Sequence, residues 1–425
     1  MTSTSAPSAA TSPTPTEAAV RSEVLAWFAK AWDPDLSLGQ WREILIDSGW
    51  AVPSWSPESF GRGLPSWADQ VAHQAIRHAG GVATPVGVSM FLAAPTLYDH
   101  ASDDLKHRFL RRTLSGELVW CQLFSEPGAG SDLAGLTTTA VRDGDDWIVN
   151  GQKVWNTSAD HADAGLLVAR TDWGAAKHAG LTYFVLDMDQ PGVEVRPIRQ
   201  MNDHRSFNEV FLTDARIPHD QVVGEVGGGW TVARGTLAHE RTFSVLQRAH
   251  VEPDTTGRAV EEARAEAADY LKTYVWYPQR AGRVDLVIER ARSFGLADDP
   301  IVRQEIMKLL AFNRAAELTA ERAKAARALG RPPGPEGSIG KLALSEVARR
   351  CNRVHSLIAG ARAMLSDGRD PLDAVVAEVL VSTPAQSIAG GTDEIQRNIV
   401  GENILGLPRE PAVDRNKPFR EVGAP

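Results

Sequence analysis

The hydrophobic pattern of the chain changes twice, and these changes constrain the fold more than any single motif does. Before residue 119, apolar residues recur at three-and-four spacing, as in WREILIDSGW and WADQVAHQAIRHAG, which predicts helices. Between 119 and 226 the apolar runs are short and β-rich, as in GLLVAR and LTYFVLDM, and Gly, Pro and Asp separate them. After the glycines at 227–229 the helical spacing returns. This order predicts an α+β multidomain protein.

The length of 425 residues leaves room for three domains of about 150 residues each. We expect an N-terminal helical domain over 22–118, a middle β-barrel or β-sandwich over 119–226 and a C-terminal four-helix bundle over 227–411. Residues 1–21 are rich in Ser, Thr, Ala and Pro, without the basic and apolar regions of a signal peptide. We therefore predict a disordered tail over 1–21 and a C-terminal tail over 412–425.

The strongest local signal is a β-hairpin. Asp143-Gly144 and Asn150-Gly151 stand on either side of the short run WIV, and Asp-Gly and Asn-Gly pairs favour the tight turns that join antiparallel strands.

Charge and cysteine content exclude several classes of protein. The formal net charge is -9, from 45 Lys and Arg against 54 Asp and Glu, and no basic run gathers on one segment, so a nucleic-acid partner is not expected. The two cysteines, Cys121 and Cys351, form neither a disulfide framework nor a metal-spaced cluster. We expect a cytoplasmic location and no metal. Glycine and proline interrupt the uncharged stretch 80–98, which favours a buried helix over a membrane span.

Two runs in the β-region indicate a binding site. In WCQLFSEPGAGSDL, small residues at 128–130 let backbone N–H groups approach a planar or anionic ligand; a polar loop is the alternative. A dinucleotide fingerprint and a GxSxG nucleophile elbow around Ser131 are both absent. In NGQKVWNTS, Trp155 and Thr157 lie two apart on a predicted strand and would share a face. An indole beside a hydroxyl suits an aromatic heterocycle, although core packing is the alternative.

With FNEVFLTDARIP, GGGWTVARGTLAHER and GGTDEIQRNIVGE following in order, these runs resemble the acyl-CoA dehydrogenase family from about residue 22 to 411. The resemblance implies FAD between the β-domain and the C-terminal helices, with an acyl-CoA thioester against the flavin. It implies cofactor contacts from the β-domain at Gln122, Phe124, Ser125, Gly130, Ser131, Trp155 and Thr157. Further cofactor contacts are implied at Ser293, Phe294, Gly391, Thr392 and Glu394, with Ser131, Arg241 and Gly390 also beside the substrate.

The family's reaction needs a carboxylate that removes the proton alpha to the thioester. Many family members carry it just before the Gly-Thr of the last motif, where this chain has Gly390. Glu240 in LAHERTF is the candidate base, because some branches of the family place it there and keep a small residue at the other position. Arg241 matches an arginine common beside the active site. The alternative for Glu240 is an ion pair on the helix surface.

Two segments depart from the family pattern. An arginine that usually precedes the Ser293-Phe294 pair is Ala291, so Arg290 or Arg292 would have to substitute. The segment TYVWYPQRAGR, 273–283, lengthens the connection after the helix that carries Glu240. Its aromatic and arginine residues are expected either to face the CoA phosphates or to pack a loop.

The sequence thus predicts an FAD-dependent acyl-CoA dehydrogenase that passes electrons to an electron-transferring flavoprotein. We expect no nucleic-acid or membrane partner, and a homodimer, homotetramer or heterotetramer. Two alternatives stay open: a flavin enzyme of other chemistry on the same fold, such as a monooxygenase or desulfinase, and a non-catalytic subunit of a heteromeric complex.

Overall fold

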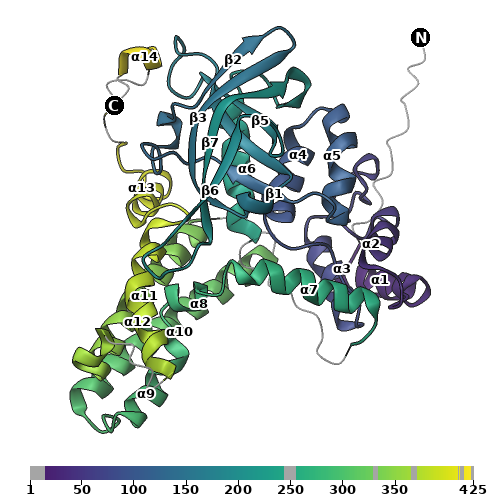
Figure 1. Ribbon diagram of the computed structural model, residues 1–425. Helices are drawn as coiled ribbons and strands as arrows, with labels where there is room; N and C mark the ends of the chain where they lie inside the picture. The colour runs from purple at the N-terminus through teal and green to yellow at the C-terminus, as the bar shows by residue number, and fades with distance from the viewer. Residues whose placement is uncertain are drawn as a thin grey trace, which may run out of the picture.

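The computed structural model describes residues 15–243, 255–328, 334–364, 371–409, 411 and 416–422. Helices come first, a sheet domain follows, and helices return (Figure 1), which confirms the predicted α+β multidomain class. The N-terminal helices are α1 (Glu17–Ala31), α2 (Leu38–Asp47), α3 (Trp67–His78), α4 (Ala94–His100) and α5 (Asp103–Ser115), with a π-helical turn η2 (Ser89–Ala93) before α4.

The first helix corrects the predicted tail over 1–21. Helix α1 begins at Glu17, because the Thr16 hydroxyl accepts a hydrogen bond from the Ala19 N–H at 3.2 Å and caps the helix. Val20, Val24 and Phe28 bury one face of α1 in the N-terminal core. Residues 1–14 of that tail lie outside the described residues.

The central domain is one connected sheet of eight strands, in the order β6-β7-β3-β2-β4-β5-β8, with β1 parallel to β4. The expected middle β-domain is thus confirmed, as a single sheet. Its strands are β1 (Trp120–Leu123), β2 (Thr139–Asp143), β3 (Asp146–Thr157), β4 (Ala164–Arg170), β5 (Leu181–Asp187), β6 (Val193–Ile198), β7 (Phe207–Pro218) and β8 (Val222–Val223).

The predicted hairpin forms at the first of its two turn signals. Asp143 pairs with Asp146, and Gly144 takes the left-handed conformation (φ 61°) that the tight turn requires. The second signal, Asn150-Gly151, is a β-bulge inside β3, where the register with β7 shifts between Val149 and Gly151. A Cβ at Gly151 would lie 2.4 Å from the Thr138 hydroxyl, so close packing and not a turn explains this glycine.

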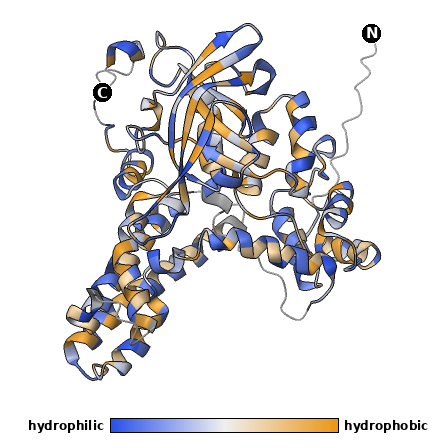
Figure 2. Ribbon diagram, viewed as in Figure 1, coloured by the Kyte–Doolittle hydropathy of each residue, from blue (hydrophilic) through white to orange (hydrophobic). Residues whose placement is uncertain are grey.

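Both faces of the central strands are buried, so alternate residues enter two different cores. Leu166 and Val168 of β4 pack in the core shared with the N-terminal helices, whereas Leu167 and Ala169 pack in the core on the other face of the sheet. In Figure 2 the sheet carries both apolar (orange) and polar (blue) residues along its visible strands. Phe124, just after β1, belongs to the first core, which places this end of β1 beside the N-terminal helices.

The C-terminal helices separate into two groups, and α6 (Gly229–Phe243) packs on β5, η2 and α4. The other group forms an arm that extends away from the sheet (Figure 1), in which α11 packs on both α10 and α12. Its helices are α8 (Tyr277–Arg280), α9 (Val287–Ser293), α10 (Pro300–Ala328), α11 (Glu336–Ala359), α12 (Pro371–Ile388) and α13 (Asp393–Asn403). Helix α7 (Arg258–Lys272) connects the two groups. The short helix α14 (Phe419–Val422) packs on the β-domain, where the ring centroid of Phe419 lies 3.4 Å from the Arg170 guanidinium carbon.

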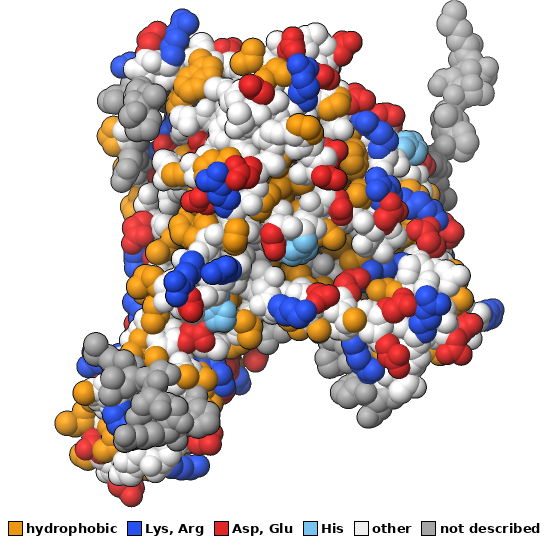
Figure 3. All heavy atoms as spheres, viewed as in Figure 1, with side chains coloured by type: hydrophobic (Ala, Val, Ile, Leu, Met, Phe, Trp, Pro, Cys, Tyr) orange, Lys and Arg blue, Asp and Glu red, His pale blue; other side chains and the backbone are white. Residues whose placement is uncertain are grey.

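In the part of the chain that the structure describes, one stretch, Leu372–Asn403, is long and apolar enough to cross a membrane by length and composition. It is not one continuous helix, because α12 ends at Ile388 and α13 begins at Asp393. On the face drawn in Figure 3, acidic and basic side chains are interspersed.

Candidate functional site

The two motif runs of the β-domain lie side by side. The Val154 N–H of β3 donates to the Ser125 carbonyl at 2.9 Å. Two residues further along β3, Asn156 donates from Nδ2 to the Gln122 carbonyl at 2.6 Å. The predicted cofactor residues Gln122, Phe124 and Ser125 are therefore brought together with Trp155 and Thr157. We call this surface the β1–β3 wall.

A buried ion pair that was not predicted holds this wall together. Glu126 and Lys153 are both buried, and Lys153 Nζ lies 2.9 Å from Glu126 Oε1 and 3.0 Å from the Phe124 carbonyl. The N–H groups of Thr137 and Thr138 also donate to the Glu126 carboxylate, at 2.7 and 2.9 Å. Burial alone would raise the pKa of Glu126, but Lys153 and these donors outweigh it and lower the pKa to about 2. The carboxylate thus anchors the start of the PGAG loop.

Trp155 occupies a β-bulge, which corrects the expected strand alternation. The register with β7 shifts between Val154 and Asn156, and Trp155 has a φ of 64°, a left-handed value uncommon for a bulky residue. Because the bulge inserts a residue, Trp155 and Thr157 are not related by simple two-residue periodicity. The indole is 58% exposed and meets the edge of Phe207 at 5.9 Å between ring centroids. The backbone thus directs a large flat side chain away from the core.

Glu240, the candidate base, lies one turn after Thr236 on α6. Thr236 is buried, and its hydroxyl lies 2.9 Å from the hydroxyl of Thr96 and 3.1 Å from that of Tyr183. Glu240 itself is half-buried. Burial is the main cause that raises the pKa of Tyr274 and of Tyr277, and the charge of the Glu240 carboxylate raises both pKa values further. The side chain of Arg241 lies outside the described residues.

The Ser293-Phe294 pair lies in the arm and not at the β1–β3 wall (Figure 1). The guanidinium groups of Arg290 and Arg362 both contact the Phe294 ring, at 5.0 and 5.1 Å from its centroid. Arg290 is fully buried and pairs with the buried Asp373 at 3.2 Å. Of the two arginines proposed to replace the missing family arginine, Arg290 is therefore a core residue, whereas Arg292 is exposed.

The glycine pair before α13 is a left-handed turn. Gly390 and Gly391 have φ values of 67° and 83°, and Thr392 caps α13 by accepting from the Ile395 N–H at 3.2 Å. The residue that follows, Asp393, is buried and pairs with Arg349 at 2.7 Å. Gly390 is exposed, and a Cβ there would meet no atom within 4 Å. Glu394 is exposed and pairs with Arg397 at 3.2 Å.

Family models match the chain in three consecutive parts: the N-terminal domain of acyl-CoA dehydrogenases over residues 16–117, the middle domain over 121–215 and the C-terminal domain over 283–405. The chain belongs to the acyl-CoA dehydrogenase family. The acyl-CoA dehydrogenase IpdE1 of Mycobacterium tuberculosis is 36% identical over 382 residues, which cover 87% of this chain and 88% of IpdE1.

Another similar family member is considerably longer than this chain. The acyl-CoA dehydrogenase FadE34 of M. tuberculosis is 37% identical over 365 residues, or 86% of this chain but 46% of FadE34, so the chain spans just under half the length of that relative. Among solved structures, a chain of the ChsE4-ChsE5 complex from M. tuberculosis is 27% identical, with a TM-score of 0.63 and coverage of 94% of this chain and 99% of the other.

In this acyl-CoA dehydrogenase family member, the β1–β3 wall has buried polar atoms without hydrogen-bond partners and an exposed glycine loop beside them. Both features suit a flat polar ligand. The side chains of Gln122, Asn156 and Asn208 each carry a buried polar atom that has no hydrogen-bond partner within the described chain: Gln122 Nε2, Asn156 Oδ1 and Asn208 Oδ1. Buried polar atoms are almost always hydrogen-bonded, so unpartnered ones beside a wall indicate a ligand or water. In the adjoining loop, Gly130 and Ser131 are exposed, and a Cβ at Gly130 would meet nothing within 4 Å. These residues fit the family's flavin.

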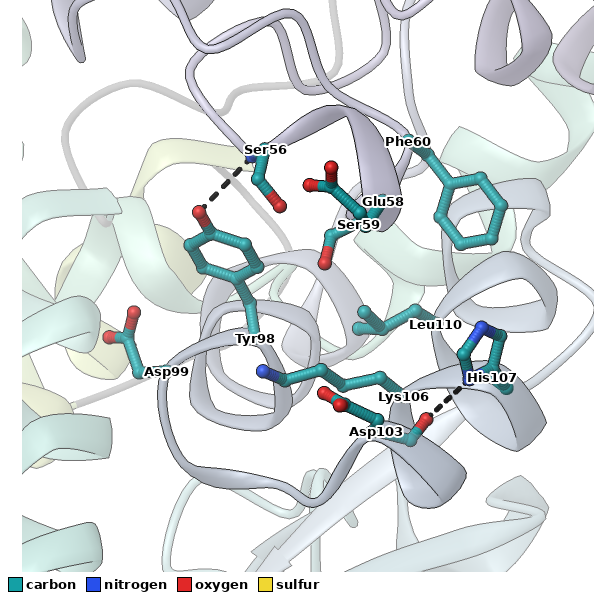
Figure 4. A pocket seen from close by; sticks show the side chains of 10 residues that line it. All are labelled: Ser56, Glu58, Ser59, Phe60, Tyr98, Asp99, Asp103, Lys106, His107 and Leu110. Atoms are coloured by element: carbon teal, nitrogen blue, oxygen red, sulfur yellow. Dashed lines mark hydrogen bonds between the residues drawn. The ribbon is translucent and has the colours of Figure 1, made fainter.

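A cavity of about 660 Å³ lies on the N-terminal helices, with Asp99 in its lining (Figure 4). Asp99 pairs with His239 Nε2 at 2.8 Å, and His239 immediately precedes Glu240 on α6. The cavity is lined by Ser56, Glu58, Ser59, Phe60, Tyr98, Asp99, Asp103, Lys106, His107 and Leu110. The Asp99–His239 pair therefore links the lining of this cavity to helix α6.

Proposed function

We propose that this chain is an FAD-dependent acyl-CoA dehydrogenase that introduces a double bond between the alpha and beta carbons of an acyl-CoA thioester. One observation carries the proposal. A half-buried carboxylate, Glu240, lies on a helix that packs against the sheet carrying the β1–β3 wall, whereas the alternative base position, Gly390, is an exposed glycine on the arm.

Each of these groups has a proposed role. Bound FAD supplies the acceptor, at N5, for the hydride that leaves the beta carbon. Trp155 flanks the ring system, and the Thr157 hydroxyl and the Gln122 amide supply hydrogen bonds to it. Glu240 takes the alpha proton: the C–H bond breaks, its electrons form the new double bond, and the proton moves to the carboxylate. We expect an electron-transferring flavoprotein to accept the electrons afterwards.

A second protomer is part of this proposal. Ser293 and Phe294 lie at the end of α9 in the arm, apart from the β1–β3 wall of the same chain (Figure 1). If these residues also contact FAD, they contact the FAD held by another protomer. A homo-oligomer satisfies this geometry, and so does a heteromer, as in the ChsE4-ChsE5 complex to which this chain is similar.

Purified chain is expected to be yellow, with the visible absorption spectrum of an oxidised flavin, and anaerobic addition of a suitable acyl-CoA is expected to bleach it. A chain that purifies colourless and gains flavin only with a second gene product would identify the non-catalytic subunit instead. Flavin that stays oxidised under every acyl-CoA while oxygen is consumed, or while a sulfinate thioester is turned over, would favour a same-fold enzyme of other chemistry.

The acyl group is proposed to be bulky or branched beside the thioester. With the base on α6, the other base position is Gly390, where an added Cβ would meet no atom within 4 Å, and we infer that a bulky acyl group has space there. Branched acyl-CoAs are therefore expected to bleach the flavin at least 10-fold faster than straight short-chain ones, since poor positioning of the reacting carbon costs about that much or more. Stopped-flow bleaching with matched pairs of substrates measures the ratio, and a preference for straight short chains would contradict it.

A further inference from the structure

The last described residues of the chain, 416–422, pack on the β-domain (Figure 1), and we call them the C-terminal strap. The Phe419 N–H donates to the Ala175 carbonyl at 2.9 Å, and the N–H of the next residue donates to the Trp173 carbonyl at 3.1 Å. Both carbonyls belong to residues 171–180, which join β4 to β5 and which we call the β4–β5 loop. The backbone of the strap is thus bonded to one loop of the β-domain.

The aromatic side chain of the strap covers a buried arginine. Phe419 is buried, and its ring centroid lies 3.4 Å from the guanidinium carbon of Arg170, the last residue of β4. Trp173 contacts both, at 5.5 Å between its ring centroid and that of Phe419 and at 5.7 Å from the guanidinium carbon. Arg170 is itself fully buried. A cation removed from water needs compensation, and the face of an aromatic ring supplies part of it. Phe419 therefore stabilises the charge of Arg170 in its buried position.

Arg170 in turn holds the stretch that follows the PGAG loop. Its Nη2 donates to the Ala134 carbonyl at 2.7 Å, and its Nε donates to the Leu136 carbonyl at 3.2 Å. Its Nη1 donates to the Lys177 carbonyl of the β4–β5 loop at 3.1 Å. Because a guanidinium is a rigid planar fork, these three bonds fix the carbonyls relative to one another. Arg170 thus joins the stretch after the PGAG loop to the loop on which the strap packs.

This stretch carries one of the predicted contacts of the site. We call residues 131–136 the Ser131 segment, because it begins with the residue that the family resemblance places beside both flavin and substrate. Lys177 of the β4–β5 loop pairs through Nζ with the carboxylate of Asp132. The Gly135 N–H donates to the Asp132 carbonyl at 2.8 Å and closes a tight turn within the segment. The β4–β5 loop therefore holds the Ser131 segment on one side and contacts the strap on the other.

We propose that Phe419 and Arg170 are positioning residues, through which the C-terminal strap sets the conformation of the Ser131 segment. This inference rests on the proposed function, in which the segment meets FAD and the thioester. Phe419 keeps Arg170 in place, and Arg170 keeps the carbonyls of the segment in place. A segment that is already ordered binds its ligand without the entropic cost of ordering it then. The strap is thus assigned to the binding site although it does not touch the ligand.

The test replaces Phe419 by alanine and follows hydrogen–deuterium exchange of the Ser131 segment by mass spectrometry. FAD is kept in excess so that wild type and variant are equally loaded. Exchange in the segment is expected to rise about 10-fold or more, since a desolvated cation–π contact is strong enough for a change of that size. Exchange in helix α3 is expected to stay at its wild-type rate. Glu421→Ala, which removes an exposed side chain from the same short helix, is the matched control and is expected to change neither.

The second readout is the release of flavin, followed by the return of its fluorescence when the loaded chain is diluted. Release is expected to be about 10-fold faster in Phe419→Ala and in a chain that ends at residue 415, because the binding loop is less ordered. A chain that ends at Val422 keeps the strap and is expected to release flavin at the wild-type rate.

The outcomes separate this inference from the proposed function. Unchanged exchange in the Ser131 segment of Phe419→Ala, or an equal rise in helix α3, would overturn the role of the strap. Faster exchange confined to the segment, with flavin release unchanged, would support the hold of the strap on the segment and refute the segment's proposed contact with FAD. A wild-type chain without affinity for FAD would refute the proposed function, and exchange of the Ser131 segment would still decide whether the strap holds it.

Discussion

Replacing Glu240 by glutamine is expected to lower the rate of anaerobic flavin bleaching by an acyl-CoA about 10²–10⁴-fold, which is the range that a positioned general base contributes. Glutamine has nearly the shape of glutamate but does not accept the alpha proton. Flavin content and acyl-CoA binding are expected to stay near wild type, so the loss falls on the chemical step alone. Stopped-flow absorbance with saturating substrate measures it directly.

The matched control is Glu261→Gln, because Glu261 is an exposed glutamate on the neighbouring helix α7. It removes the same charge without touching the proposed site, and bleaching is expected to keep its wild-type rate. A Glu240→Gln chain that bleaches as fast as the wild type would show that the proton goes elsewhere. Because Gly390 has no side chain, the base would then have to be sought among other residues near the wall.

Replacing Lys153 by methionine is expected to lower the free energy of unfolding by about 3–5 kcal/mol, the usual cost of leaving one partner of a buried ion pair alone. Lys153 is fully buried, and its removal leaves the Glu126 carboxylate without its cation. The PGAG loop is expected to loosen, and flavin occupancy to fall with it. Urea unfolding followed by circular dichroism measures the stability, and absorbance measures the bound flavin.

Lys308→Met is the control for this experiment, since Lys308 pairs with Glu305 at 2.8 Å but its side chain is 54% exposed. Exposed pairs contribute about 1 kcal/mol or less. The double variant with Glu126→Gln is expected to recover part of the lost stability, because no unpaired buried charge remains. Equal losses in Lys153→Met and Lys308→Met would contradict a structural role for the buried pair.

The same pair predicts the acid stability of the chain. The pKa of Glu126 in the folded state is about 2, below its ordinary value of 4.5. A carboxyl group with a depressed pKa stabilises the fold fully above its unfolded value and loses that contribution as the pH falls toward the folded value. Stability is therefore expected to decrease below about pH 4.5, and Glu126→Gln is expected to flatten this part of the curve.

Local signals predicted local structure well and failed where packing decided the outcome. Asp143-Gly144 forms the predicted turn, because its conformation is set within a few residues. Asn150-Gly151 is the same type of turn-forming pair, but it lies inside β3. There the side chain of Thr138 leaves no room for a Cβ at Gly151. The start of the helix at Glu17 was wrongly placed in the predicted tail. The few apolar residues on this helix are buried only by contacts with distant helices, so the local sequence gave no sign of them.

The site shows the same division. Two runs of the β-region were predicted to form a binding site, and the structure places them side by side, with Val154 bonded to Ser125 and Asn156 to Gln122. The pairing of Glu126 with Lys153 gave no such signal, because ion pairs 27 residues apart depend on how two strands are placed. The segment 273–283 was recognised as unusual, but its sequence did not predict that Trp276 would pack on Phe207 and donate to the Ser206 hydroxyl of the β-domain.

The sequence by itself determined the helix–sheet–helix order, the family resemblance and the absence of a carboxylate at Gly390, because periodicity and residue identity are properties of single segments. Tertiary structure alone decided that Trp155 stands in a bulge, that a buried ion pair anchors the loop and that Trp276 of the segment 273–283 packs on the β-domain. These features arise from contacts between segments far apart in the chain, whose free energy appears only when both sides are packed together.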